Sequence, residues 1–324
     1  MAKPKVAYYE IQNYQPASIG MLEKAFDLIR LQTPDDDTPE LLNSLDGVIA
    51  PLKYLYNKQK IDSFAKLKVI GANCTGAPHI DIPYAESKGI KVMYLRHEKE
   101  FLKKITPTAE MAWGLLLAVS RRIPWAFDAV CAGTWDRTDW PAEKMMSRMA
   151  LGIVGIGRIG IMVARYGRAF DMKVRYYDPF VKNLDAEGME KVGTLEELVA
   201  VSDAVSLHSH LPEGNGCMFG AKMLSKFKPG SYLINTARGP LIDDLALINA
   251  LKNGPLAGAG IDVHPKEFEP DFFENLDTDP LIRYAREHDN LILTPHIAGC
   301  TYDGWQMTEE HVIGMMIDAF NGKR

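Results

Sequence analysis

The sequence is short of cysteine, has no surplus of basic residues and has no long apolar run. Its four cysteines, Cys74, Cys131, Cys217 and Cys300, lie far apart and form neither a CxxC pair nor a histidine-paired spacing typical of metal ligands. We therefore expect free buried thiols and neither a disulfide framework nor a metal site. Since 37 Lys and Arg stand against 42 Asp and Glu, no basic surplus favours nucleic acid as a main partner.

Nothing in the sequence points to a membrane. The longest strongly apolar stretch, residues 111–119, is much shorter than the roughly 20 residues that a membrane-spanning helix needs. The first residues carry lysines but are followed by no apolar signal core. These absences predict a cytoplasmic protein with no membrane partner. The 324 residues contain no repeat, low-complexity tract or Gly/Ser linker, and their number suggests two domains.

Short apolar, β-rich runs alternate with amphipathic segments, a pattern typical of parallel sheets covered by helices. It predicts early strands at residues 5–9, 47–50, 67–71 and 90–93 and helices near 19–30, 58–64 and 81–88. A long apolar helix begins at about residue 106 and runs to about 119. A second series of strands is predicted at 151–154, 173–177, 204–207, 232–235, 259–263 and 291–294, with a last helix near 303–320.

A glycine pattern directly follows the predicted strand at 151–154. Gly155, Gly157 and Gly160 have the GxGxxG spacing, and apolar residues at helical spacing come next. In this context Gly155 allows a tight turn, Gly157 lets the backbone approach a pyrophosphate, and Gly160 lets helix and strand pack closely. A glycine-rich turn without a ligand is the weaker alternative.

Asp178 stands at the end of the next predicted strand, where a dinucleotide site needs a residue that reads the ribose. A carboxylate accepts hydrogen bonds from both ribose hydroxyls and repels a 2′-phosphate, so NAD is favoured over NADP. Arg175 would favour NADP, but it lies inside the strand. A solvated strand face explains Arg175 better.

Four polar residues stand at the ends of later predicted strands, where open α/β sheets bind ligands. Arg238 is followed by Gly-Pro, which stops the strand, and its guanidinium can clamp a carboxylate. Asp262 closes an Ala/Gly-rich strand, Glu267 follows it, and His296 comes just after the last strand. Each alone has a structural explanation. Together they predict a carboxylate clamp, an acid/base histidine and a carboxylate that holds the imidazole.

The chain resembles the D-isomer-specific 2-hydroxyacid dehydrogenases of the formate and phosphoglycerate dehydrogenase superfamily over nearly its whole length. The matching segments are residues 108–112, the glycine loop with Asp178, and residues 206–208, 234–239, 262–267 and 294–299. The resemblance implies an α/β protein in which a Rossmann-type doubly wound cofactor domain, residues 104–295, is inserted in a flavodoxin-like substrate domain, residues 1–103 plus 296–324. It also implies NAD as the cofactor and a small 2-oxo or 2-hydroxy acid as the substrate.

The resemblance further implies a role for each matching residue. In ketone reduction Arg238 binds the carboxylate of the 2-oxo acid, and His296, oriented by Glu267, donates the proton. As an anion, Glu267 would raise the pKa of His296. Asp262 would lie near the nicotinamide carboxamide. The remaining positions imply substrate-binding backbone amides at Thr75 and Gly76, pyrophosphate-binding amides at Arg158 and Ile159, and further cofactor contacts at Thr108, His208, Thr236 and Ala237.

Several positions depart from the family pattern. His210 follows Ser209 where the family usually has proline, and it would either reach the cofactor or stay in solvent. His264 replaces a more usual apolar residue, and no role follows for it from the sequence. Residues 51–56 are aromatic and basic, so Lys53 or Tyr54 is a candidate for setting substrate choice.

The sequence therefore predicts an NAD-dependent D-2-hydroxyacid dehydrogenase. Two alternatives share the fold: an NAD(H)-sensing regulatory protein, and a phosphite- or formate-type dehydrogenase. No added tail or basic patch supports the regulatory protein. A formate dehydrogenase would need further active-site amides, which the sequence does not reveal. By resemblance we expect a homodimer through the cofactor domain, with the helix from residue 106 and residues 132–135 in the interface, because exposed Trp135 and Trp140 would be an apolar liability.

Overall fold

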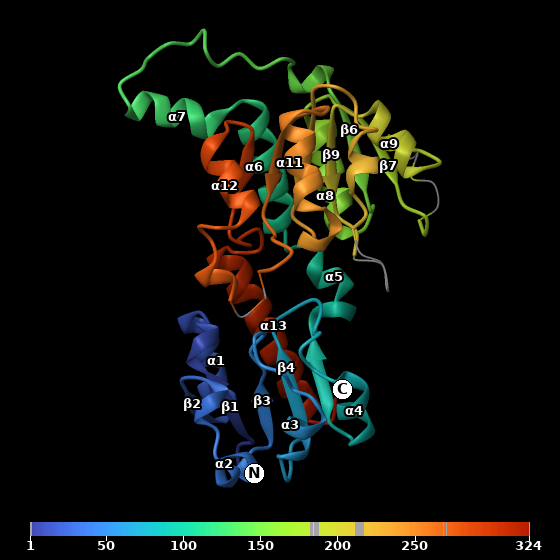
Figure 1. Cartoon of the computed structure of the whole chain (residues 1–324). Helices are drawn as coiled ribbons and strands as arrows, with labels where there is room; N and C mark the ends of the chain where they lie inside the picture. Colours follow the sequence, from blue (N-terminus) through green and yellow to red (C-terminus); the bar gives the residue numbers. More distant parts are fainter. Residues whose placement is uncertain are drawn as a thin grey trace. The chain divides into compact units, whose positions relative to one another are not determined.

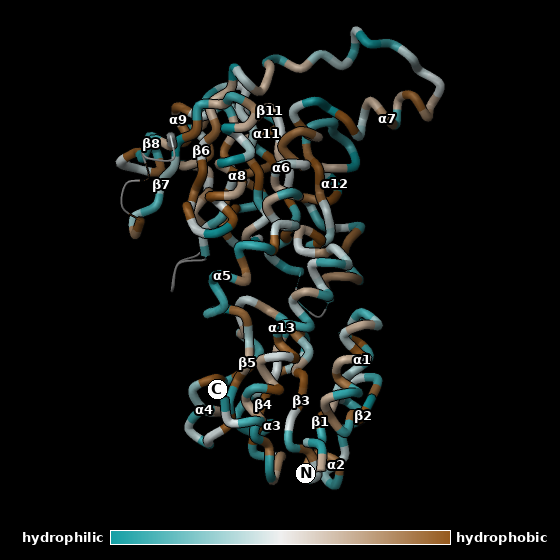
Figure 2. The backbone as a smooth tube through the Cα atoms, turned by 180° about the vertical axis from the view of Figure 1, so that it is seen from behind, coloured by the Kyte–Doolittle hydropathy of each residue, from teal (hydrophilic) through white to brown (hydrophobic). Residues whose placement is uncertain are grey.

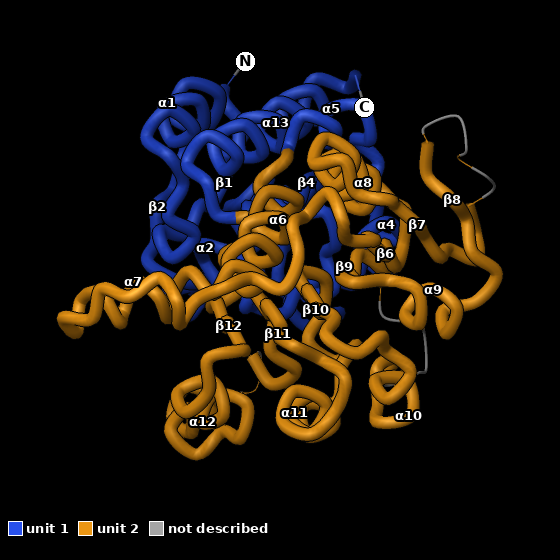
Figure 3. Tube along the Cα trace, turned by 90° about the horizontal axis from the view of Figure 1, so that it is seen from above, with its two compact units in different colours: residues 1–105, 300–324 blue, residues 106–299 orange. Residues whose placement is uncertain are grey.

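The computed structural model describes residues 2–181, 184, 188–210, 217–267, 269 and 271–323. The chain forms two compact units (Figure 3): unit 1 comprises Met1–Ile105 and Cys300–Arg324, and unit 2 comprises Thr106–Gly299. These boundaries lie two residues after the first expected boundary and four after the second. Residues 296–299 belong to unit 2 because backbone N–H groups of this turn bind Asp262 in that unit.

Unit 1 is built on a parallel five-stranded sheet (Figure 1). The strand order β2-β1-β3-β4-β5 is that of flavodoxin-like sheets, which confirms the fold predicted for this part of the chain. Alternate residues of each strand face opposite sides, so Val6 and Tyr8 join one apolar cluster and Ala7 and Tyr9 the other. The strands are β1 (Lys5–Tyr9), β2 (Asp27–Leu31), β3 (Gly47–Ile49), β4 (Val69–Ala72) and β5 (Lys91–Tyr94).

Helices cover both faces of this sheet. One face packs against α1 (Pro16–Ala25), α5 (Lys99–Leu102) and α13 (Tyr302–Phe320). The other packs against α2 (Pro39–Ser44), α3 (Lys58–Asp62) and α4 (Ile82–Ser87). The second crossing of the chain thus returns α13 to the core of unit 1.

The prediction of a helix through residue 30 is wrong. The helix α1 ends at Ala25, Phe26 is extended, and Asp27–Leu31 forms the edge strand β2 in parallel register with β1. The short apolar run Leu28-Ile29 fits helix and strand periods equally. Pairing with β1 decides the outcome, and no local feature of the sequence reports that pairing.

Unit 2 is built on a seven-stranded parallel sheet in the order β12-β11-β10-β9-β6-β7-β8. The chain starts in the centre at β6 and winds outward in both directions, which is the Rossmann-type arrangement that the sequence predicts. Residues 263 and 294, predicted to end strands, lie beyond them. The strands are β6 (Ala150–Val154), β7 (Lys173–Tyr177), β8 (Glu190–Lys191), β9 (Ala204–Leu207), β10 (Ser231–Asn235), β11 (Leu256–Ile261) and β12 (Leu291–Leu293).

Two apolar clusters lie on the two faces of this sheet. The helices α6 (Pro107–Ser120) and α8 (Arg158–Ala169) cover one face. The helices α9 (Leu195–Val201), α10 (Ala221–Leu224), α11 (Asp244–Lys252) and α12 (Pro280–Glu287) cover the other (Figure 3). Within the described residues, no helix combines the length and apolarity that crossing a membrane requires.

The expectation of buried thiols is wrong for three of the four cysteines. Cys131, Cys217 and Cys300 are exposed, and Cys74 is half-buried. Burial raises the pKa of the Cys74 thiol to about 12. Cys131 ends α7 (Ile123–Cys131) and Cys300 precedes α13, so both stand where the chain reaches the surface.

The close packing of α8 on β6 predicts a specific cost for a methyl group. A Cβ at Gly160 would lie 2.2 Å from the Gly155 carbonyl oxygen. Gly160→Ala is therefore expected to lower the free energy of unfolding by about 2 kcal/mol, measured by denaturant titration. The matched control is Gly20→Ala, at an exposed helical position with no atom within 4 Å, which should stabilise by up to about 1 kcal/mol. Equal effects of the two substitutions would contradict the packing argument.

Candidate functional site

The turn from β6 into α8 has a backbone that only glycine fits. Gly155 has φ +86, and a Cβ there would lie 2.9 Å from the backbone of His208. A Cβ at Gly157 would meet no atom within 4 Å. Gly157 is exposed and is the N-cap of α8, a twelve-residue helix. The N-terminus of α8 is therefore open to an anionic group, as a bound pyrophosphate requires.

Asp178 is held at the end of β7 by three backbone N–H groups. Its Oδ2 accepts from Ile156 at 3.0 Å, inside the glycine turn. Its Oδ1 accepts from Phe180 at 2.9 Å and from Val181 at 3.2 Å. An ionised carboxylate has about four acceptor sites. Asp178 is therefore fixed beside the glycine turn and retains capacity for a hydroxyl donor.

Arg175 is not the solvated arginine that the sequence suggests. Its Nε lies 3.0 Å from Glu190 Oε2 on the neighbouring strand β8, and its side chain is 16% exposed. Hydrogen bonds from Lys173 and then from Arg175 lower the pKa of Glu190. Arg175 thus takes part in a strand-to-strand ion pair.

The other predicted cofactor residues lie in α6 and after strands β9 and β10. The ring of His208 binds Ser206 Oγ through Nε2 at 2.8 Å, and burial lowers the pKa of His208 to about 3. The buried hydroxyl of Thr236 has no hydrogen-bond partner among the described residues. Thr108 and Ala237 are half-buried in α6 and after β10. An orphaned hydroxyl, an open helix N-terminus and a fixed carboxylate fit a dinucleotide.

The loop after β10 presents Arg238. The buried side chain of Asn235 holds this loop from both sides, because its Nδ2 donates to the Arg238 carbonyl at 2.9 Å and its Oδ1 accepts from Ala237 N–H at 3.0 Å. Arg238 is exposed. Gly239 lies so close to the backbone of His264 that a Cβ there would be 2.2 Å from the His264 carbonyl carbon. The Arg238 loop and the loop after β11 are therefore in direct backbone contact.

His296 and Glu267 form the ion pair that the sequence predicts. His296 Nδ1 lies 2.8 Å from Glu267 Oε1, with the glutamate side chain 13% exposed. The hydrogen bond to Glu267 is the main cause that raises the pKa of His296, and the charges of Glu267 and Asp262 act in the same direction. Burial and the charge of Arg238 oppose them. The arrangement stabilises the imidazolium form.

Asp262 is fully buried and holds the turn that carries His296. Its Oδ1 accepts from Thr294 Oγ1 at 2.6 Å and from Ile297 N–H at 2.9 Å, and its Oδ2 accepts from Ala298 N–H at 2.8 Å. The Asp262 carbonyl also accepts from His296 N–H at 2.8 Å. These bonds keep His296 in a left-handed backbone conformation, φ 54.

Two of these holding residues were not assigned by sequence reasoning. Asn235 and Thr294 appear in the matching segments, but a polar residue at a strand end looks the same whether its side chain points to solvent or into the next loop. Their roles depend on contacts within their own loop or across neighbouring strands. Only the small spacing between Asn235 and Arg238 offered a signal, since Asn commonly bonds backbone two or three residues on.

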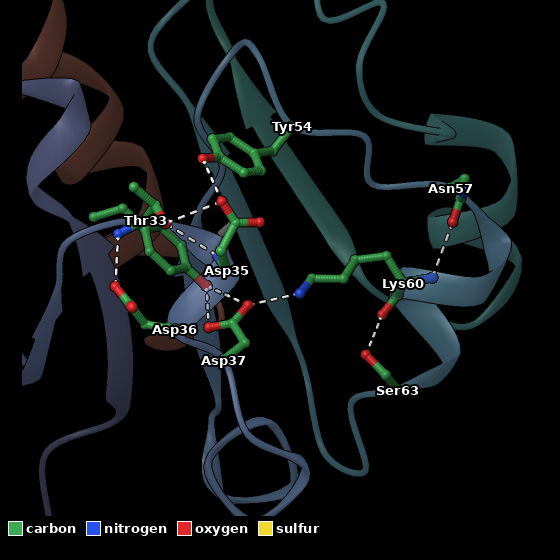
Figure 4. A network of polar contacts seen from close by, with 9 residues as sticks. Thr33, Asp35, Asp36, Asp37, Tyr54, Asn57, Lys60 and Ser63 are labelled. Atoms are coloured by element: carbon green, nitrogen blue, oxygen red, sulfur yellow. Dashed lines mark hydrogen bonds and ion pairs between the residues drawn. The ribbon is translucent and has the colours of Figure 1, made fainter.

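In unit 1, Thr75 and Gly76 are exposed in the loop that follows β4. Tyr54, a candidate for substrate choice, donates its hydroxyl to Asp35 Oδ2 at 3.0 Å (Figure 4). Near it, Lys60 binds the buried carboxylate of Asp37 at 2.6 Å. Tyr54 is thus tied to the segment after β2.

Comparison with known proteins gives consistent results. The family model for the D-isomer specific 2-hydroxyacid dehydrogenase NAD binding domain matches residues 113–298, and the model for the catalytic domain matches residues 6–100. A glyoxylate reductase of Thermofilum pendens is 33% identical over 334 residues, covering 100% of this chain and 93% of that protein. A D-3-phosphoglycerate dehydrogenase of Bacillus subtilis is 32% identical over 82% of this chain and 47% of its own length.

A solved structure is also similar. The D-lactate dehydrogenase from Aquifex aeolicus, complexed with NAD and lactic acid, has a TM-score of 0.79 at 28% sequence identity. The similarity covers 98% of this chain and 96% of that chain. It therefore extends over both units.

The ion pair predicts how His296 titrates. Glu267→Gln removes the negative charge of the group whose hydrogen bond is the main cause of the raised pKa. The pKa of His296 should therefore fall toward its ordinary value, measured by NMR titration of histidine-labelled protein. Because the pKa of His296 is raised in the folded state, protonation of His296 stabilises the fold. This stabilisation is complete below the pKa of the unfolded state and is lost as pH rises through the pKa of the folded state. The variant should lack this pH-dependent stability. An unchanged His296 titration in Glu267→Gln would contradict the assigned cause.

Proposed function

The chain belongs to the D-isomer specific 2-hydroxyacid dehydrogenases, NAD-dependent oxidoreductases that act on CH–OH groups, and we propose that it reduces a small 2-oxo acid to the D-2-hydroxy acid. The observation that carries this proposal is the Glu267–His296 pair, 2.8 Å apart, in the same unit as the Arg238 loop and the open N-terminus of α8. The three strands that carry these residues, β10, β11 and β12, are neighbours in the sheet. Their carboxyl ends supply a cation, an acid and its carboxylate partner at one edge.

Each residue has a step that its geometry supports. Arg238 binds the substrate carboxylate and draws electron density from the ketone. When bound, NADH would supply the hydride for the new C–H bond at C2. His296, protonated because Glu267 holds its Nδ1, gives its proton to the oxygen as the C=O bond is reduced. The products are NAD⁺, the 2-hydroxy acid and a neutral His296, which regains a proton from solvent.

The binding residues complete the proposal. Asp178 accepts from the adenosine ribose and excludes a 2′-phosphate by its charge, and the N–H groups of Arg158 and Ile159 bind the pyrophosphate. Thr108, His208, Thr236 and Ala237 would contact the bound cofactor, and Asp262 would bind the nicotinamide carboxamide. In unit 1, Thr75 and Gly76 are proposed as substrate-binding residues through their backbone amides.

Oxidation of NADH tests the proposal. At least one 2-oxo acid should be reduced, with NADH preferred to NADPH. The panel comprises glyoxylate, hydroxypyruvate, pyruvate, longer 2-oxo acids and phosphohydroxypyruvate. The rate should be full below the pKa of His296 and fall as pH rises through it, since the protonated form is the acid.

His296→Asn should lower kcat by about 100-fold or more, because it removes the general acid. The matched control is His288→Asn, at the end of α12, where the ring stacks on Tyr284; its kcat should equal that of the wild type. Tight NADH binding without turnover of any of these acids would instead support an NAD(H)-sensing protein.

The cofactor-binding unit also offers a surface for a second copy of the chain. No residue of α7 is buried, and Phe127 and Trp135 are 65% and 88% exposed. The helix and the segment after it extend away from the rest of unit 2, and apolar stretches mark α7 (Figures 1 and 2). Such a surface is costly in water. We propose on this basis that the chain forms a homodimer that buries α7.

Light scattering measures this directly. The wild type should have twice the 36.2 kDa mass of the chain, and Phe127→Asp with Val130→Asp should shift it to the single mass, because both side chains are exposed on α7. Ile11→Asp, at an exposed apolar position in unit 1, is the control and should remain dimeric. A wild type of single mass would refute the dimer.

A further inference from the structure

His264 lies in the same turn as Glu267. Its ring makes contacts beyond those that this turn needs to carry Glu267. Its Nδ1 accepts a hydrogen bond from Lys266 N–H at 3.1 Å. A backbone N–H can only donate, so Nδ1 carries no proton in this arrangement. The proton of a neutral imidazole is then on Nε2, at the far side of the ring.

The Nε2 side of His264 faces two carboxylates at helix starts. Asp279 Oδ2 lies 3.4 Å away and Asp244 Oδ2 3.8 Å away. Asp279 caps α12, because its Oδ1 accepts from the N–H groups of Leu281 and Ile282. Asp244 is the first residue of α11. The ring therefore links the Glu267 turn to the N-termini of two helices.

Electrostatics support this link. The pKa of Asp244 is raised to about 6, first by burial and then by the charges of Asp279 and Asp243, while His264 and Lys266 oppose the rise. Two carboxylates and a neighbouring third thus crowd one small volume, where a donor between them is favourable. The Nε2 of His264 lies within ion-pair distance of both carboxylates, although it makes no hydrogen bond among the described residues. The ring of His264 also stacks on Phe272, with 4.6 Å between ring centroids.

The backbone of His264 contacts both halves of the site. Its N–H points to Glu267 Oε2 at 3.4 Å, the oxygen that His296 does not use, and its carbonyl accepts from Glu267 N–H at 3.3 Å. Its carbonyl carbon also lies against Gly239, directly after Arg238. A displacement of His264 would therefore move the Glu267 carboxylate and disturb the Arg238 loop.

We propose that His264 is a positioning residue: held by Asp279 and Asp244, its ring fixes the Lys266–Glu267 turn and so places the Glu267 carboxylate on His296. A residue that only filled space would need the stack on Phe272 and nothing more. Phenylalanine would keep that stack, but it offers neither an acceptor to Lys266 N–H nor a ring nitrogen facing Asp279. The positioning of Glu267 by His264 does not depend on the proposed function. The effect of this positioning on turnover rests on the proposed function.

NMR titration of His296 in histidine-labelled protein tests the placement without any substrate. His296 faces Glu267, Asp262 and Arg238, and His264→Phe changes none of these three side chains. The pKa of His296 should fall in His264→Phe, toward the value in Glu267→Gln. His264→Asn, whose Oδ1 can accept from Lys266 N–H as Nδ1 does, should restore it at least in part.

Two further variants keep the test decisive. His288→Phe is the control, because His288 also stacks on an aromatic ring, with 4.0 Å between its ring centroid and that of Tyr284. In this variant His296 should titrate as it does in the wild type. If His264→Phe does not fold, His264→Gln retains a donor toward Asp279 but removes the ring acceptor, and it too should lower the pKa of His296. A wild-type His296 titration in the folded His264→Phe or His264→Gln variant would overturn the proposal.

Kinetics separate this proposal from the proposed function. With a 2-oxo acid that is turned over, His264→Phe should lower kcat by about tenfold with little change in KM, as a misplaced group near the reaction does, and should move the alkaline limb of the pH profile to lower pH. His264→Asn should recover part of kcat. If no acid is turned over but the His296 titrations follow the expected order, the proposed function fails and the positioning role stands. If an acid is turned over but the pKa of His296 does not shift in the His264 variants, the proposed function stands and the positioning role fails.

Discussion

The buried carboxylate of Asp262 is the constraint on which the rest of the site depends. It accepts hydrogen bonds from Thr294, Ile297 and Ala298, and each is a contact between the end of β11 and the turn after β12. Hydrogen bonds to an ionised acceptor are stronger than neutral ones, and here they hold His296 in a left-handed conformation that a histidine rarely adopts. Without this turn, Nδ1 of His296 would have no fixed place against Glu267.

The site as a whole is a set of loops that fix one another at one edge of a parallel sheet. Asn235 holds the Arg238 loop, and Gly239 packs that loop against His264. The turn from His264 to Glu267 then carries the carboxylate to His296. Parallel strands make this possible because their carboxyl ends lie at the same edge. The catalytic charges are therefore placed by short loops on rigid strands, which favours accurate geometry.

Much of this could be predicted from the sequence, for a physical reason. The parallel strands are short and largely apolar. The glycine turn, Arg238, Glu267 and His296 stand in the loops that follow strands, so chain order locates them. Residues whose roles arise through space could not be assigned in this way. Asp262 binds a turn 32 residues or more away, and His264 faces the starts of two helices. The strand Asp27–Leu31 was missed for the same reason, since its state is set by pairing with β1.

The central claim is that this chain transfers a hydride from NADH to C2 of a 2-oxo acid while His296 supplies the proton. The most direct measurement follows deuterium from NADH that carries deuterium at both C4 positions, [4,4-²H₂]NADH, into the product formed with the best-reduced acid. The account predicts a D-2-hydroxy acid that carries deuterium on C2 and none on oxygen after exchange with water. An L-2-hydroxy acid, or NADH that binds and leaves with no labelled acid formed, would contradict it.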